Sequence, residues 1–333
     1  MRVLHIAGSG ESAFFHDLSL LYARDVLRPE GVEADFVVVE PGGGWRFGDS
    51  LGNLGESLSA PESIARIASA PPDLAVPHLF DPVGMTTYRG LFEDVLGIPV
   101  VGSRPETTAV AARKSWTNAV LARAGLGVPE GVVHRAGEPL PDLPCPLVVK
   151  PDTGDNSEGL SLVRERGGLV AAVELARTVD ADVLVERFVP GRELRLCVVE
   201  MDGELVVPAV MEYPLDPASP VRAAADKLHV EDGRVVGQTR RAQAKPIMPA
   251  NLTPDLRERL VDAARRAHRA LGCRHYSLWD LRVREGTDEV VFLEAGLFWA
   301  FSEISMISRM LAADGHDVTD VVGRLWRDAV GLR

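Results

Sequence analysis

The sequence predicts an α/β protein with α+β character, in which an N-terminal parallel sheet precedes two regions of mixed sheet and helix. Three observations lead to this prediction. Over roughly the first hundred residues, short apolar runs alternate with amphipathic stretches, as in parallel sheets that carry helices on their faces. Near Glu130 the pattern changes to short strands joined by turns. The 333 residues would also fill two or three domains at roughly 100–200 residues each.

The N-terminal region is expected to alternate strands with helices. An apolar strand at 3–6 leads into the small-residue turn Gly8-Ser9-Gly10, and an amphipathic helix should run from Phe14 to about Leu27. Short strands that alternate with helices predict a parallel sheet. The remaining strands of this sheet are expected at 36–39, 74–76 and 99–101.

The middle of the chain is expected to form a second sheet with one helix, at 170–178. Short apolar runs bounded by turn residues indicate its strands. These strands are expected at 132–133, 147–150, 160–163 and 183–186.

The third region should hold a sheet, a long helix and a long loop. Thr253 is the predicted N-cap of the helix, which ends near Leu271 with Gly272 as its C-cap. Residues 213–250 are rich in Pro, Gly and charge with little periodicity, which predicts a functional or disordered loop. The strands of this region are expected at 195–199, 205–210, 277–283 and 290–293.

Composition and charge exclude several classes of function. The net charge of −12 argues against nucleic acid as a partner, because phosphate backbones bind basic surfaces. No stretch approaches the roughly 18 apolar residues of a membrane span, and the N-terminal apolar run is too short for a signal peptide. The three cysteines show neither a CxxC pair nor zinc-ligand spacing. We therefore expect a cytoplasmic protein with reduced thiols, which acts on small molecules.

The first chemical signal is a lysine at the end of a buried strand. Lys150 closes the apolar run 146–149 and is followed by the segment 154–159, Gly-Asp-Asn-Ser-Glu-Gly. Backbone amides in such a loop can cradle phosphate oxygens, although the segment is not a Walker A loop because it lacks GK[ST]. An ordinary hairpin turn with a surface lysine explains this segment equally well.

The second signal is a pair of carboxylates, Asp280 and Glu294. Their midpoint, position 287, is the centre of a predicted hairpin turn, so the two side chains should lie opposite each other on one face. Facing like charges are unfavourable unless a cation or proton lies between them. Magnesium prefers carboxylates together with waters and substrate phosphates, so we interpret the pair as a magnesium–nucleotide clamp. The alternative is an exposed hairpin with charged faces.

The third signal is the segment 183–193, in which a buried strand ends in a carboxylate and a short apolar linker leads to a second carboxylate. Groups at such a crossover can hydrogen-bond an adenine and a ribose. Taken alone, a strand edge followed by a loop explains it better.

In their order and spacing, these three segments resemble the D-alanine–D-alanine ligase family of the ATP-grasp superfamily, and the resemblance is collinear over nearly the whole chain. It implies an ATP-grasp fold with an N-terminal parallel α/β pre-ATP-grasp domain, divided at 1–103, 104–190 and 191–333. It also implies ATP and Mg²⁺ as cofactors, and a homodimer.

The resemblance assigns several residues to the phosphates of ATP. Lys114 and Lys150 match the family's two nucleotide lysines, and Lys227 matches the lysine of a mobile loop. Ser157 keeps the serine of the loop over the phosphates, next to Asn156. Lys150, Ser157 and Lys227 are therefore the predicted catalytic residues.

Other matched residues would surround the nucleoside and the metal. They are Glu186, Phe188 and Val189 at the adenine, Glu193 at the ribose, and Asp280 and Glu294 as two of the family's three metal ligands.

The substrate side is similar to the family but altered. Asp17 matches the acid that binds the first substrate's amino group, and His78 the histidine that opens the next substrate loop. Ser305 matches the serine that binds the second substrate's carboxylate. Trp299 belongs to the apolar segment 297–301, which replaces a glycine-rich substrate turn. The aromatic side chains predict a bulkier, more apolar pocket than one for alanine; alternatively, they pack the core under the C-terminal helix.

Three positions depart from the family. Gly296 replaces the asparagine that is its third metal ligand, and Leu278 replaces an arginine that stabilises the tetrahedral oxyanion. Such a contribution is normally worth on the order of 100-fold in rate. Gly84-Met85-Thr86 replaces an acidic stretch.

The resemblance implies an ATP-dependent carboxylate–amine ligase that forms an amide through an acyl phosphate. The altered substrate residues predict an unusual amino acid, as in antibiotic or other specialised metabolism. An intramolecular cyclising synthetase, an ATP-binding regulator without turnover and a small-molecule kinase are the alternatives.

Overall fold

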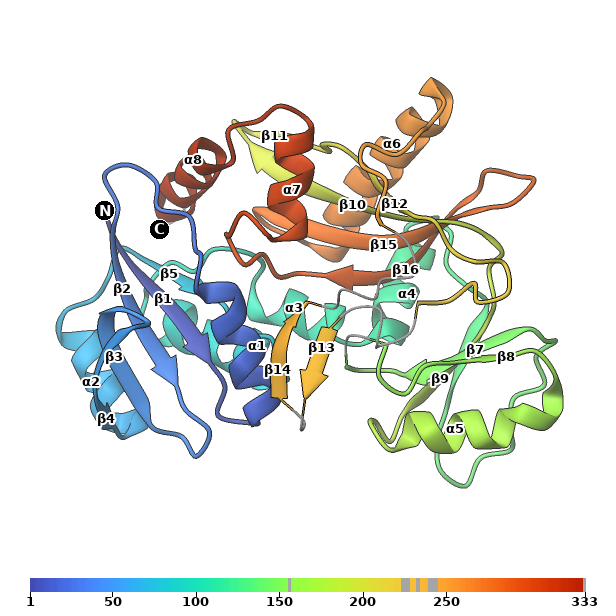
Figure 1. Cartoon of the computed structure of the whole chain (residues 1–333), viewed down its shortest axis with the longest axis horizontal. Coiled ribbons are helices and arrows are strands. Elements are labelled where there is room, and N and C mark those ends of the chain that lie inside the picture. The colour runs from blue at the N-terminus through green and yellow to red at the C-terminus, as the bar shows by residue number, and fades with distance from the viewer. Residues whose placement is uncertain (155–156, 223–227, 232–233, 239–244, 332–333) are drawn as a thin grey trace.

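The computed structural model describes residues 1–154, 157–222, 228–231, 234–238 and 245–331, which form a mixed α/β structure (Figure 1). Its N-terminal sheet has the strand order β4-β3-β2-β1-β5. Strands β1, β2 and β5 are parallel, as the alternating pattern predicts, and a β3–β4 hairpin extends the sheet in the antiparallel sense. The predicted strand at 99–101 is reduced to one bridge between Ala75 and Val100. The strands are β1 Arg2–Gly8, β2 Glu33–Val39, β3 Trp45–Ser50, β4 Asn53–Leu58 and β5 Leu74–Pro77.

The first helix, α1 (Ala13–Ala23), is shorter than predicted. Its start is fixed by Ser12, whose hydroxyl accepts a hydrogen bond from the Phe15 amide at 3.2 Å. It ends before Leu27 because the chain turns away there to meet the C-terminal region, where the Leu27 amide donates to the Phe301 carbonyl at 2.7 Å. The other helical segments of this half are α2 Ala60–Ser69, η1 Gly84–Tyr88, η2 Leu91–Val95, α3 Pro105–Ala111 and α4 Lys114–Arg123.

The central sheet forms a separate lobe with helix α5 (Leu169–Arg177) packed on one face (Figure 1). Its strand order is β6-β9-β7-β8, and every neighbouring pair is antiparallel. The predicted strands of this region are confirmed. They are β6 Gly131–His134, β7 Leu147–Pro151, β8 Ser161–Val163 and β9 Val183–Arg187.

The third sheet buries both of its faces. Alternate residues of its long strand β10 (Gly191–Met201) point to opposite sides. Leu194 and Leu196 pack toward α6 (Pro254–Leu271), whereas Cys197 joins a core shared with the N-terminal sheet and α8 (Val318–Gly331). The remaining elements are β11 Glu204–Val206, β12 Met211–Tyr213, β15 Tyr276–Arg284, β16 Val290–Gly296 and α7 Met306–Ala313.

Helix α6 has the predicted ends. Thr253 accepts a hydrogen bond from the Leu256 amide at 3.3 Å, and Gly272 takes the left-handed conformation, with φ of 72°, that ends a helix without a side-chain clash. Within the ranges given above, none of the helices has the length and apolar character needed to cross a membrane.

The segment 213–250 was predicted to be irregular, and in part this is wrong. Strands β13 (Leu228–Glu231) and β14 (Arg234–Gln238) pair antiparallel within it, and β14 lies beside α1 (Figure 1). Its lack of hydrophobic periodicity hid this hairpin.

A pair of buried histidines links the first strand to the segment after β5. His5 Nδ1 lies 3.0 Å from His78 Nε2, and both residues are about 1% exposed. The His5 ring stacks on Phe36 with centroids 4.8 Å apart and also contacts Trp326. Burial lowers the pKa of His78 to about 3 and holds the pKa of His5 well below its usual value. Both rings are therefore neutral near pH 7.

This pair predicts a loss of stability in mild acid. Below the unfolded pKa of about 6.5, the unfolded chain binds protons that the folded chain excludes, so the free energy of unfolding falls as the pH drops toward about 3. Each such histidine contributes up to about 1.4 kcal/mol per pH unit. We expect the urea midpoint to depend less on pH between about 7 and about 5 in His5→Phe than in the native protein. The partly exposed His316 provides the control His316→Gln; equal pH slopes for all three proteins would contradict the account.

Candidate functional site

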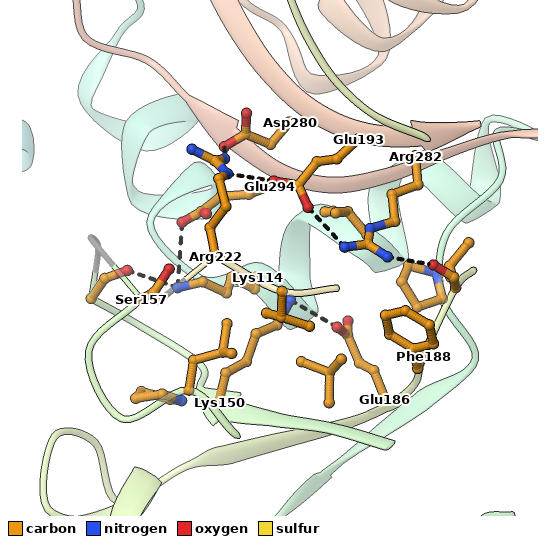
Figure 2. A pocket seen from close by; sticks show the side chains of 18 of the residues that line it. Lys114, Lys150, Ser157, Glu186, Phe188, Glu193, Arg222, Asp280, Arg282 and Glu294 are labelled. Atoms are coloured by element: carbon orange, nitrogen blue, oxygen red, sulfur yellow. Dashed lines mark hydrogen bonds and ion pairs between the residues drawn. The ribbon is translucent and has the colours of Figure 1, made fainter. Parts of the chain in front are cut away.

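A pocket of about 820 Å³, counting its open mouth, lies between the central sheet and the third sheet (Figure 2). It gathers most of the predicted nucleotide and metal residues, which come from segments far apart in the chain. They are Lys114, Lys150, Ser157, Glu186, Phe188, Val189, Glu193, Asp280 and Glu294. Asn156 and Lys227, also predicted there, lie outside the described residues.

A buried ion pair forms the floor of the pocket. Lys150, at the end of β7, lies 2.7 Å from a carboxylate oxygen of Glu186 on the neighbouring strand β9. Asn118 on α4 donates to the other oxygen of Glu186 at 2.7 Å. Both charged side chains are less than one tenth exposed, so removing either one would leave the other as an uncompensated buried charge. The ion pair therefore holds the Lys150 ammonium and the Glu186 carboxylate in place at the floor of the pocket.

Lys114 bridges the two halves of the pocket. Its ammonium donates to the Gly154 carbonyl at 2.7 Å and lies 3.5 Å from a carboxylate oxygen of Glu294. The buried Asp152 holds the start of α4 in place, because its carboxylate accepts hydrogen bonds from the Ser115 amide at 2.7 Å and the Ser115 hydroxyl at 2.8 Å. The position of Lys114 is thus set by the hydrogen bonds that Asp152 accepts from the first turn of α4.

Two described residues of the segment after β7 have a left-handed backbone conformation. Gly154 has a φ of +85° and Ser157 a φ of +62°. Ser157 lines the pocket beside Lys114 (Figure 2). Together, this loop and the two lysines can hold a chain of phosphates.

The predicted carboxylate pair is present, with a partner for each member. Asp280 on β15 lies directly opposite Glu294 on β16. Glu294 faces Lys114, as described above. Asp280 instead receives two hydrogen bonds from Arg195 on β10, from Nε to Oδ1 and from Nη2 to Oδ2, each at 2.5 Å.

Arg282 and Arg222 also line the pocket, and sequence reasoning identified neither of them. Arg282 donates to Glu193 and to the Val189 carbonyl at 2.8 and 2.9 Å and lies over the Phe188 ring, 4.8 Å from its centroid; it also donates to the Pro220 carbonyl. This arginine therefore ties the predicted adenine hinge to the predicted ribose carboxylate. Its sequence signal was its position two residues after Asp280, on the same face of the strand.

Arg222 closes the network on the other side of Glu193, to which its Nε donates at 2.6 Å. Burial opposes the charge of Arg222, but the carboxylates of Asp280 and Glu193 outweigh this effect and raise the pKa of the guanidinium. No periodicity in the irregular stretch around Arg222 could have indicated this contact.

Comparison with known proteins identifies the family. The family model described as D-ala D-ala ligase C-terminus matches residues 138–327. A D-alanine–D-alanine ligase from Mycolicibacterium smegmatis is 31% identical over 376 residues, which cover 100% of this chain and 97% of the relative. The ligase from Mycolicibacterium gilvum is 30% identical over 377 residues, covering 100% and 99%. The chain belongs to the D-alanine–D-alanine ligase family.

Solved structures share the fold at lower identity. The VanG D-Ala:D-Ser ligase from Enterococcus faecalis superposes with a TM-score of 0.77 at 23% identity, covering 97% of this chain and 98% of that one. The Bacillus anthracis D-alanine–D-alanine ligase complexed with ATP superposes with a TM-score of 0.74 at 18% identity, covering 100% and 98%. The ATP-grasp fold is thereby confirmed. As a member of this family, the chain is an ATP-dependent, ADP-forming C–N ligase that uses ATP and Mg²⁺.

The pocket of this ligase offers limited protein ligation for magnesium. Among the described residues, no group of three His, Cys, Asp or Glu side chains is placed to hold a metal ion. Glu294 fits a magnesium ion that takes its other ligands from phosphates and water. Asp280 fits less well, because Arg195 engages both of its oxygens.

On the substrate side of the ligase, the predicted residues do not line the pocket that holds the nucleotide residues. Asp17 lies on α1, 3.6 Å from His16, with its side chain 14% exposed. His78 is buried against His5. Ser19, close to Asp17, is a cross-link: its hydroxyl donates to the His78 carbonyl and accepts from the Gly8 amide, both at 2.7 Å.

Trp299 and Ser305 both contact Ser308 in the C-terminal core. Ser305 caps α7, and its hydroxyl lies 2.9 Å from that of Ser308, which also accepts a hydrogen bond from the Trp299 indole. Trp299 is about 1% exposed and stacks on Phe301. The structure therefore favours core packing, the alternative to a substrate contact, for Trp299.

Phe298 is the aromatic residue of this segment that remains half-buried. Its ring meets the edge of Phe80 at 5.3 Å between centroids, and Phe80 in turn contacts Tyr22 on α1. These three rings join the N-terminal region to the loop after β16.

The Lys150–Glu186 pair predicts separable effects on folding and on nucleotide binding. Lys150→Met would leave Glu186 buried without its partner, which should cost about 3–5 kcal/mol of stability and weaken nucleotide binding. Lys150→Met combined with Glu186→Gln should recover most of the stability, measured by urea unfolding, whereas the nucleotide Kd should stay raised by about 10-fold or more because a charged hydrogen bond is lost. Recovery of both properties would show that Lys150 is purely structural.

Proposed function

We propose that this ligase activates the carboxylate of one amino acid with ATP and joins it to the amine of a second. The observation that carries the proposal is the single pocket in which Lys114, Lys150 and the loop at Ser157 lie opposite Glu294. Cations and turn amides suit the phosphates, while the facing carboxylate suits a magnesium ion. The curated relatives named above are D-alanine–D-alanine ligases, and the VanG neighbour is a D-Ala:D-Ser ligase.

The reaction runs in two steps. A carboxylate oxygen of the first substrate attacks the γ-phosphorus of ATP; a new P–O bond forms, the bond to the β-phosphate oxygen breaks, and ADP leaves with that electron pair. The amine of the second substrate then attacks the acyl carbon, phosphate departs, and the nitrogen loses a proton. Magnesium, when bound, neutralises charge on the phosphates.

The protein contributes mainly position and charge to these steps. Lys114 and Lys150 are held by Gly154 and Glu186, respectively, so they need little reorganisation when the phosphates arrive. Phe188 and Val189, fixed by Arg282, form a hinge against which an adenine can lie.

The amino acid is an unusual one with an apolar side chain, of the kind used in antibiotic or other specialised metabolism. Leu278 and Gly296 remove the arginine and the amide that the family resemblance leads one to expect. The half-buried rings of Tyr22, Phe80 and Phe298, next to α1 with Asp17, offer an apolar surface.

ADP release by the purified protein tests the proposal across a panel of D- and L-amino acids, alone and in pairs, with mass spectrometry of the products. We expect ADP only with particular apolar amino acids, together with a product one water lighter than the sum of its parts. A single amino acid that loses water would indicate the cyclising variant. Nucleotide binding without ADP under any condition would favour the regulator, and a phosphorylated amino acid as final product would indicate a kinase.

A further inference from the structure

The contact between Arg195 and Asp280 gives the metal site an unusual partner. The two residues are direct register partners on β10 and β15. The guanidinium engages both carboxylate oxygens in the parallel two-bond geometry that fits arginine to carboxylates. Both side chains are mostly buried, at 18% and 12% exposure. Asp280 therefore already holds a cation.

The positions that the family resemblance assigns to an arginine and an asparagine carry apolar residues in this sheet. Leu278 pairs with Gly296 on one side and with Cys197 on the other. The three atoms nearest to a Cβ atom built on Gly296 belong to the Leu278 and Phe298 side chains, at 3.6–3.7 Å. The two positions where the resemblance leads one to expect an arginine and a metal-binding asparagine thus form an apolar strip. The positive charge of Arg195 lies two residue pairs further along the same strands.

The surrounding network keeps this guanidinium in place. Arg222 lies 3.7 Å from the centroid of the Tyr213 ring, and Arg195 lies 5.6 Å from the same centroid. Arg222 also approaches Asp280, with a nitrogen–oxygen distance of 3.7 Å. With Arg282, three guanidinium groups therefore contact the carboxylates of Asp280 and Glu193.

We propose that Asp280 holds Arg195 in place of a magnesium ion, so that the ligase binds a single magnesium ion, at Glu294 and the ATP phosphates. The Arg195 guanidinium thus balances the charge of Asp280 at the position that the magnesium–nucleotide interpretation gave to a metal ion. This inference rests on the proposed function, because it assumes that ATP occupies the pocket.

The test is a count of bound metal ions, made independently of turnover. Mn²⁺ titration followed by electron paramagnetic resonance, with saturating non-hydrolysable ATP analogue, should give one Mn²⁺ per protein. In Arg195→Met combined with Gly296→Asn, which releases Asp280 and adds an amide ligand, it should give two. Arg192→Met is the matched control: Arg192 lies on the same strand and makes a similar two-bond pair, but with Glu212, and its removal should leave the count at one.

Two Mn²⁺ ions in the unmodified protein would overturn the inference, and this measurement does not depend on whether the variants fold. A count that stays at one in the folded double variant would also contradict it. The failure of this inference and the failure of the proposed function give different results. One Mn²⁺ per bound nucleotide without amino acid turnover would support the metal inference and contradict the proposed function. Amino acid turnover with two Mn²⁺ would support the proposed function and contradict the metal inference.

Discussion

The pocket depends on Lys114, which connects the two sheets that enclose it. Its ammonium donates to the Gly154 carbonyl in the segment after β7 and lies 3.5 Å from Glu294 of the third sheet. Because Asp152 caps the helix that begins with Lys114, the lysine is presented from a fixed point. Other carboxylates of the site are arranged in the same way: each lies on one strand and forms an ion pair with a cationic side chain from another element. Lys150 meets Glu186, and Arg195 meets Asp280. These ion pairs join neighbouring elements around the pocket.

The alternation of β10 explains how one strand serves both the core and the site. Leu194 and Leu196 bury one face against α6, while the opposite face carries Arg195 toward Asp280 and Cys197 toward the shared core. Buried apolar residues on both sides of Arg195 prevent the sheet from shifting register. Burying the Arg195–Asp280 ion pair costs desolvation free energy, so the pair contributes less to stability than to the fixed orientation of the guanidinium.

The sequence predicted those features that local rules determine. The ends of α6 follow from Thr253 and Gly272, and the pairing of Asp280 with Glu294 follows from the centre of one short turn. The β3–β4 and β13–β14 hairpins were missed because their strands lack a clear apolar alternation. Arg195 was missed for a different reason: its partner lies 85 residues away in the chain, and the register between such distant strands is set by tertiary packing. The role of Trp299 was ambiguous because an apolar segment has the same sequence pattern whether it lines a pocket or packs in a core.

Oxygen transfer from the substrate carboxylate to phosphate distinguishes phosphorylation of that carboxylate from simple ATP hydrolysis. When the accepted amino acid carries ¹⁸O in its carboxylate, the acyl phosphate route moves one of these oxygens to the inorganic phosphate released with the product. We expect one ¹⁸O atom in each phosphate released, as measured by mass spectrometry. Unlabelled phosphate alongside ADP would contradict it, because the ATP would then have been cleaved by water.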